Sequence, residues 1–394
     1  MIKKICAVLC FAVLCMALLP VRGMAAPASD WEQRVNDEVS RQLDNLNLNE
    51  WGVLWEDEKS QWGITPDVKG FTMQLLRGQA WVSGEGVLGA FSGIFAKGMA
   101  GNLGLLAHLL GLCVVFGMLQ KSRESLTEKS ASSLAETLVY LYAVVVILWS
   151  LMGLITGIGR TIDRLLAFSN LIFPLFAALL AACGGLTASG ILAPTVSTTL
   201  NVLTVVSKGL LLKLPLYGAV LAVVGHLGSE NGFKGLLSLI KSGVKWIVGV
   251  TLTLLLAMVT LQGSTAAAVD GVSLRTAKFA VDSIVPVAGG MFKDMVDTVI
   301  GCSALIKNAL GVTGMLTLLM ICVGPLVQGL GIYFSLKITA AAAGPLGAKR
   351  LGECVDDIAS MVSLLMVALL LAGVLVFVMI AVFVMTGNAV LTMG

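Results

Sequence analysis

Long apolar runs separated by short charged segments make up most of the chain. Six runs are plain, at 101–120, 137–158, 171–192, 246–263, 312–336 and 361–385. Each approaches the roughly 20 residues that an α-helix needs to cross the hydrocarbon core of a bilayer. Two less regular segments, 194–212 and 214–227, lie between the third and fourth runs. The pattern predicts an all-α fold, a polytopic membrane helix bundle of about seven to eight spans.

Charged residues between the runs predict the loops. The segment KSRESLTEKS after the first run is rich in cations, as cytoplasmic loops are. The next interruption contains Arg160, Asp163 and Arg164 and is expected to be a loop on the outer side. The last cationic loop, with Lys337, is again expected in the cytoplasm.

The region 193–228 decides the sidedness of everything that follows it. If 194–212 and 214–227 cross separately around a break at Pro215, the loop with Lys234, Lys241 and Lys245 is cytoplasmic. If the two form one span, this loop lies outside. The excess of Lys and Arg in cytoplasmic loops favours the first arrangement. That arrangement places the segment 270–311 outside the cytoplasm.

The N-terminus has the pattern of a secretory signal peptide over residues 1–25. Lys3 and Lys4 precede an apolar run over 5–19, and small residues stand at Gly23 and Ala25. The run is short for a membrane span, which favours cleavage. The mature chain is therefore expected to begin outside the cytoplasm.

Residues 26–100 are predicted to form a small acidic, Trp-bearing extracytoplasmic segment. Nine acidic residues face three basic ones between Asp30 and Lys59, and five tryptophans lie between Trp31 and Trp81. An apolar residue recurs every fourth position at Val35, Val39 and Leu43, which is typical of an amphipathic helix. Its apolar face would rest on the membrane or on a partner protein. The polytopic membrane domain then occupies 101–394.

Within that domain, the segment 270–311 is the richest in paired charge. A PVAGG turn at 286–290 separates two halves with apolar residues at helical spacing, which predicts an amphipathic helical hairpin. Charges of both signs beside a membrane can specify a protein surface, although a solvated loop without a partner has the same composition. The candidate partner-docking residues are Arg275, Lys278, Asp282, Lys293, Asp294 and Asp297.

Composition excludes several classes of protein. The chain is 57% hydrophobic and 12% charged with a net charge of +3, and no basic patch suits nucleic acid. Eight cysteines show no CxxC or Cys/His spacing, so they are interpreted as packing residues rather than metal ligands. With two histidines and none of the common catalytic motifs, we expect no enzyme, no cofactor and no metal.

A secondary transporter for small solutes is the alternative function. Transporters often contain broken helices and ionisable groups at mid-membrane depth. The segments around Pro215 and Pro325, with Lys208 and Lys213 near the first, are the candidates for such breaks.

The run DGVSLRTAKFAVDSIVPVAGGMFKDMVDTVIGCSALIKNALG, preceded by LQG at 261–263, closely resembles the stage III sporulation protein AE family of endospore-forming bacteria. The similarity extends over nearly the whole chain. It implies a multi-pass protein of the mother-cell membrane surrounding the forespore. It also implies hetero-oligomeric partners, the other stage III proteins of a channel-like complex that resembles secretion systems. The family supplies no catalytic residues.

Overall fold

The computed structural model describes residues 38–44, 46, 48–62, 64–77, 84–125, 129–227, 233–284 and 289–393. Within these ranges the regular structure is entirely helical. After a helical segment at 38–44, the elements are α3 (Asn49–Trp62), α4 (Val68–Leu76), α5 (Gly84–Ala100), α6 (Leu103–Ser125), α7 (Lys129–Ala182), α8 (Leu186–Thr204), the π-helix η1 (Val205–Leu211), α9 (Lys213–Leu227), α10 (Lys234–Ile284), α11 (Gly289–Ala343) and α12 (Lys349–Met393). The predicted signal peptide, residues 1–25, lies outside the described residues.

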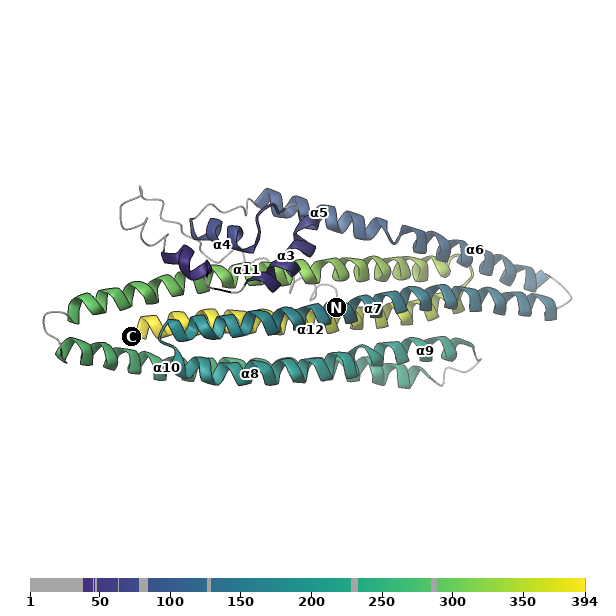
Figure 1. Ribbon diagram of the computed structural model, residues 1–394. Coiled ribbons are helices and arrows are strands. Elements are labelled where there is room, and N and C mark those ends of the chain that lie inside the picture. The colour runs from purple at the N-terminus through teal and green to yellow at the C-terminus, as the bar shows by residue number, and fades with distance from the viewer. Residues whose placement is uncertain are drawn as a thin grey trace.

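Very long helices give the molecule its elongated shape (Figure 1). The longest, α7 and α11, have 54 and 55 residues. At 1.5 Å per residue such a helix is about 80 Å long, well beyond a hydrocarbon core of about 30 Å. The helices therefore have length to spare beyond any single crossing.

Six helices in the described part of the chain are long and apolar enough to cross a membrane. They are Ser92–Lys121, Leu134–Ala182, Leu186–Leu227, Lys234–Val259, Thr298–Ala343 and Lys349–Val390. The prediction of seven to eight spans is not confirmed. Two pairs of segments that the sequence separates are each joined in one continuous helix.

The first joined pair is in α7, where the predicted outer loop is absent. Residues 159–170 are helical throughout. Their charged side chains lie on the helix surface and find partners there: Arg164 pairs with Glu58 and Asp163 with Lys208. Because these charges are accommodated without ending the helix, the loop prediction is wrong. The chain reverses later, at Gly184, whose φ of 87° suits a residue without Cβ.

The second joined pair is α8, η1 and α9, which follow one another without reversal. The favoured arrangement of 194–212 and 214–227 as separate crossings is therefore wrong. Pro215 has no N–H to donate and its ring crowds the carbonyl four residues earlier. The π-helical turn just before it widens the backbone, and the Leu212 N–H bonds the Ser207 carbonyl five residues back.

The long helices run antiparallel and meet at two ends. At the His226 end, on the right of Figure 1, α9 and α11 finish while α7, α10 and α12 begin. At the Asp270 end, on the left, α7, α10 and α12 finish while α8 and α11 begin. The segment 270–311 supplies the last turns of α10 and the first turns of α11. The amphipathic hairpin predicted there stays a prediction.

Helices α11 and α12 form the centre of the bundle. In the most apolar stretch of the span in α11, 78% is buried inside the protein. In the corresponding stretches of the spans that contain α6 and α10, the buried share is 22%. The N-terminal helices α3 and α4 pack on the outside of α11. There Trp51 donates its indole N–H to Thr317, and the Thr72 and Thr313 hydroxyls lie 3.2 Å apart. The acidic N-terminal segment is thus held on the bundle by buried aromatic and hydroxyl side chains.

Candidate functional site

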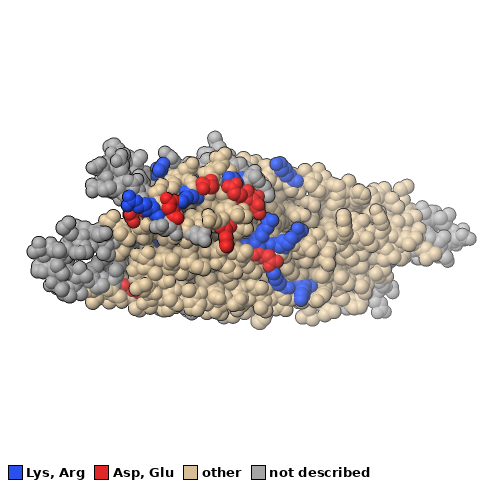
Figure 2. Space-filling model, viewed as in Figure 1, with Lys and Arg blue, Asp and Glu red and all other residues tan. Residues whose placement is uncertain are grey.

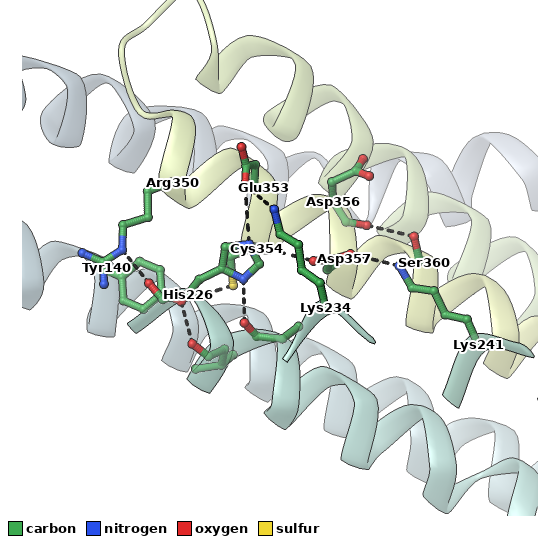
Figure 3. A network of polar contacts seen from close by, with 12 residues as sticks. Tyr140, His226, Lys234, Lys241, Arg350, Glu353, Cys354, Asp356, Asp357 and Ser360 are labelled. Carbon is green, nitrogen blue, oxygen red and sulfur yellow. Dashed lines mark hydrogen bonds and ion pairs between the residues drawn. The ribbon is translucent and has the colours of Figure 1, made fainter. Parts of the chain in front are cut away.

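A network of polar contacts lies at the His226 end (Figure 3). Four helices contribute to it: α7 supplies Tyr140, α9 His226, and α10 and α12 the charged groups. Lys241 Nζ lies 2.9 Å from Asp357 Oδ1, and Lys234 Nζ lies 3.7 Å from Glu353 Oε2. Each ion pair joins the start of α10 to the start of α12. The network therefore fixes where two long helices meet.

His226 lies between these ion pairs. Its Nδ1 is 2.7 Å from the Ala222 carbonyl oxygen, and its Nε2 is 3.9 Å from both Glu353 Oε2 and Asp357 Oδ2. The two carboxylates are four residues apart, so they project from one face of α12. The imidazole side chain is only 11% exposed. A nearly buried imidazole thus faces two carboxylates across one short gap.

Arg350 and Tyr140 close the end of α9. Arg350 donates from its guanidinium to the carbonyl oxygens of His226 and Leu227, which are among the unpaired carbonyls that every helix leaves at its C-terminus. The same guanidinium lies 5.4 Å from the centre of the Tyr140 ring. The Tyr140 hydroxyl donates to the Val223 carbonyl oxygen and lies 3.4 Å from Cys354 Sγ. Helices α7, α9 and α12 are joined in this way.

A second group of charges lies near mid-length of the bundle. Figure 2 shows charged side chains gathered there and over the N-terminal helices, while much of the surface that it draws is uncharged. Arg164 Nη1 on α7 is 2.8 Å from Glu58 Oε1 on α3, and Lys208 pairs with Asp163. Burial raises the pKa of Glu58, and the neighbouring Arg164 opposes this effect. The pair ties the acidic N-terminal segment to α7.

At the Asp270 end, two buried polar residues bind backbone groups. Asp270 accepts from the Thr187 and Ala188 backbone N–H groups, at 2.9 and 2.6 Å, so it caps the start of α8 from α10. Lys307 of α11 is fully buried and donates to the Val384 carbonyl and to Asn388 Oδ1 of α12. Both contacts connect helices that the sequence separates by about 80 residues.

The predicted docking residues fall at this same end. Arg275, Lys278 and Asp282 belong to the last turns of α10, and Lys293, Asp294 and Asp297 to the first turns of α11. Their side chains lie outside the described residues, so the docking prediction stays a prediction.

The acidic half of the His226 network was not predicted from the sequence. The predicted loop contains Lys234 and Lys241, but no sequence pattern indicated that Glu353 and Asp357 pair with them. The spacing contained a signal: the carboxylates are four apart and the lysines seven apart, which places each pair on one helical face. Nothing in the sequence showed that these two faces meet.

Comparison with known proteins identifies the family of the chain. The family model for stage III sporulation protein AE matches residues 67–387. Over 395 residues the chain is 29% identical to stage III sporulation protein AE of Bacillus subtilis (strain 168), covering 98% of each chain. No solved structure matches it. The chain belongs to the stage III sporulation protein AE family.

Proposed function

We propose that this chain is a non-enzymatic, multi-span component of the mother cell to forespore channel complex, a secretion-like assembly required during endospore formation. It would lie in the mother-cell membrane surrounding the forespore and work as one subunit of a hetero-oligomer with other stage III proteins. Membership of the family supports a role in sporulation. The more detailed role is supported by the architecture.

The observation that carries the proposal is the set of six long apolar helices that the described part of the chain packs into one bundle. Their outer faces expose large apolar side chains, including Trp149 at 83% and Trp246 at 70%. Such faces are unfavourable in water and suit lipid or neighbouring subunits. A membrane subunit built mainly from packed helices needs no cofactor for this role.

The small-solute transporter is not favoured. It rested on interrupted helices near Pro215 and Pro325. Pro325 lies inside continuous α11, and Pro215 follows a π-helical turn that continues into α9. Transporter sites are typically built at true breaks, where helix ends point at the substrate. Purified protein in liposomes is expected to show no solute uptake by itself.

The test combines charge reversal with isolation of the complex from sporulating cells. Replacing Lys278 and Lys293 by Glu is expected to reduce co-purification of partner proteins, because complementary charge fixes the register of an interface. The amount of protein in the membrane fraction should stay unchanged. A matched control reverses two exposed lysines nearer the His226 end, Lys245 and Lys349. Wild-type recovery of partners with the Lys278 and Lys293 variant would refute the docking role.

A further inference from the structure

Three exposed cations lie on the side of the bundle formed by α5, α6, α7 and α9. They are Lys97 of α5, Arg160 of α7 and Lys213 of α9. No ion pair joins any of them to a carboxylate among the described residues, unlike the two neighbouring cations that pair with Glu58 and Asp163. Each of the three lies within a candidate membrane span, and a cation in contact with hydrocarbon is unfavourable.

Contacts between α7 and α9 place two of these cations at one level of the bundle. Gly159 of α7 faces Leu212, since a Cβ added to the glycine would lie 3.7 Å from Leu212 Cδ1. Arg160 and Lys213 are the next residues along the two segments, which run antiparallel. Their Cα atoms are therefore within about one helical turn of each other along the bundle axis.

The third cation, Lys97, lies at nearly the same level. Gly98 beside it packs on Val327 of α11. Two residues further along α11, Gly329 packs near Leu154 of α7. Because α11 and α7 run antiparallel, Lys97 is level with a position about three residues after Leu154, which is about 5 Å from the level of the α7 arginine. Lys97, Arg160 and Lys213 thus form a cation belt across the long axis of the bundle.

The outward face of α7 changes at the cation belt. Among the described residues, the large apolar side chains exposed on α7 all lie before the arginine, from Leu134 to Met152, and Trp149 is 83% exposed. From the arginine to its end, a stretch that the structure describes throughout, α7 exposes no large apolar side chain. Its exposed residues there include Asp163 and Asn170.

A similar change occurs at the α9 end of the cation belt. On the His226 side of Lys213, the exposed residues of α9 are all large and apolar: Tyr217, Val220, Val224 and Leu227. On the other side, α8 also exposes polar residues, among them Ser197, Thr198 and Asn201. In the surface that Figure 2 draws, the part on the His226 side of the mid-length cations is uncharged. Helix α10 is not part of this surface, because it exposes large apolar side chains on both sides of Lys245.

Charged N-terminal helices cover the bundle on the Asp270 side of the cation belt. Helices α3 and α4 contact α11 at Thr317 and Thr313. These residues precede Val327 by about ten residues or more, which is at least about 15 Å. The exposed carboxylates of α3, such as Glu56 and Asp57, favour water over hydrocarbon. The cation belt therefore separates an apolar surface from one that requires water.

We propose that the cation belt binds the phosphate groups of anionic phospholipids at the membrane surface. Lipid phosphates supply the negative partners that the protein does not, and guanidinium and ammonium groups both bind phosphate strongly. The acyl chains then cover the apolar surface on the His226 side. Along α7 the distance from Leu134 to Arg160 is about 39 Å, which is enough for a hydrocarbon core of about 30 Å. The Asp270 half of the bundle, with α3 and α4, extends out of the membrane.

Spin labels on α7 test the depth of the cation belt, which rests on the membrane location given in the proposed function. Single nitroxides are placed at the exposed positions Trp149 and Asn170 of a cysteine-free full chain, in vesicles of phosphatidylcholine and phosphatidylglycerol. The label at 149 is expected to collide with oxygen, which concentrates in hydrocarbon, and the label at 170 with a water-soluble nickel chelate. A label at 170 as deep as the one at 149 overturns the inference and leaves the membrane location standing. Collision of both labels with the nickel chelate would contradict the membrane location itself, and the inference with it.

Lipid binding tests the three cations themselves. In Lys97→Gln/Arg160→Gln/Lys213→Gln, binding of the first phosphatidylglycerol to the detergent-solubilised full chain should weaken by about fivefold or more in native mass spectrometry. Phosphatidylcholine, whose headgroup has no net charge, should bind equally to the variant and to wild type.

The matched control removes three cations in or next to α3 and α4: Lys59→Gln/Lys69→Gln/Arg77→Gln. It should keep phosphatidylglycerol binding within about twofold of wild type, because these residues lie away from the proposed membrane surface. Unchanged binding in the cation-belt variant, or an equal weakening in this control, overturns the proposal.

Discussion

At the scale of single residues, buried polar side chains at the Asp270 end connect helices that are distant in sequence. Asp270 is only 2% exposed and both of its carboxylate oxygens accept backbone N–H groups of α8. A carboxylate at a helix N-terminus satisfies otherwise unpaired donors and interacts favourably with the helix dipole. Asp270 therefore positions the start of α8 against α10.

Replacing Asp270 tests this cap. Asp270→Ala should destabilise the protein by about 1–3 kcal/mol, because two buried donors lose their acceptor. Asp270→Asn keeps one acceptor oxygen and should cost less. The measurement is made by size-exclusion chromatography of the detergent-solubilised protein after heating. The quantity compared is the temperature at which half of the monodisperse peak is lost. Ser273→Ala, an exposed change one turn along α10, is the control and should have little effect. Equal stability of Asp270→Ala and wild type would contradict the cap.

The close packing of Lys307 against α12 makes a second prediction. A Cβ added at Gly387 would lie 2.0 Å from Lys307 Nζ, whereas one at Gly324 would meet nothing within 4 Å. Gly387→Ala should therefore lower the unfolding temperature, while Gly324→Ala in α11 should be tolerated. Lys307→Met combined with Gly387→Ala should cost less than the sum of the two changes, because the clash is relieved. Additive costs in this double-mutant cycle would exclude a direct contact.

At the scale of elements, the attachment of α3 to α7 should depend on pH. Burial raises the pKa of Glu58 above its ordinary 4.5, so the folded state binds this proton more tightly than the unfolded chain. The stabilisation from Glu58 is then fully present below pH 4.5 and is lost as the pH rises through the raised value.

Hydrogen exchange of the α3 amides measures this dependence. The difference in opening free energy between wild type and Glu58→Gln, compared at equal pH, should shift in favour of wild type as the pH falls from about 7 to 4. The intrinsic exchange rate of an amide depends on pH, and it cancels when the two proteins are compared at the same pH. Glu56→Gln is the matched control, because Glu56 is an exposed carboxylate that pairs with Lys59 on the same helix. This control should not show the same shift. If acidification instead increased the opening free energy of Glu58→Gln relative to wild type, the raised pKa of Glu58 would be contradicted.

The sequence predicted the helical class, but not which segments are continuous. Apolar runs indicated helices because the backbone must satisfy its own hydrogen bonds in lipid. Interruptions were interpreted as loops, and at 160–164 this failed. The charges there find partners on other elements, Glu58 of α3 and Lys208 of η1. Such partners come from tertiary packing, which hydropathy does not contain.

At the scale of the whole molecule, the two topology errors have opposite effects. The sequence predicted chain reversals near 160–164 and near Pro215, and neither is present in the structure. Because two reversals are absent, the direction of every later helix is unchanged, and 270–311 lies at the same end of the bundle as the reversal at Gly184 (Figure 1).

The polar site was less predictable than the spans. Lys234 and Lys241 were visible in the sequence as loop cations, and only the antiparallel packing of α9, α10 and α12 brings Glu353 and Asp357 close to Lys241 and His226.

Cysteine accessibility from the two sides of the membrane tests the six-helix bundle most directly. The described native cysteines are buried, so single cysteines in a cysteine-free background can be probed. Cysteines placed at the exposed positions 233, 344 and 345 are expected to react with a membrane-impermeant maleimide from one side. Those placed at the exposed positions 182 and 186 should react from the other side. Labelling of 233 and 186 from the same side would contradict the continuous crossing of α8, η1 and α9, and with it the bundle proposed to work in the complex.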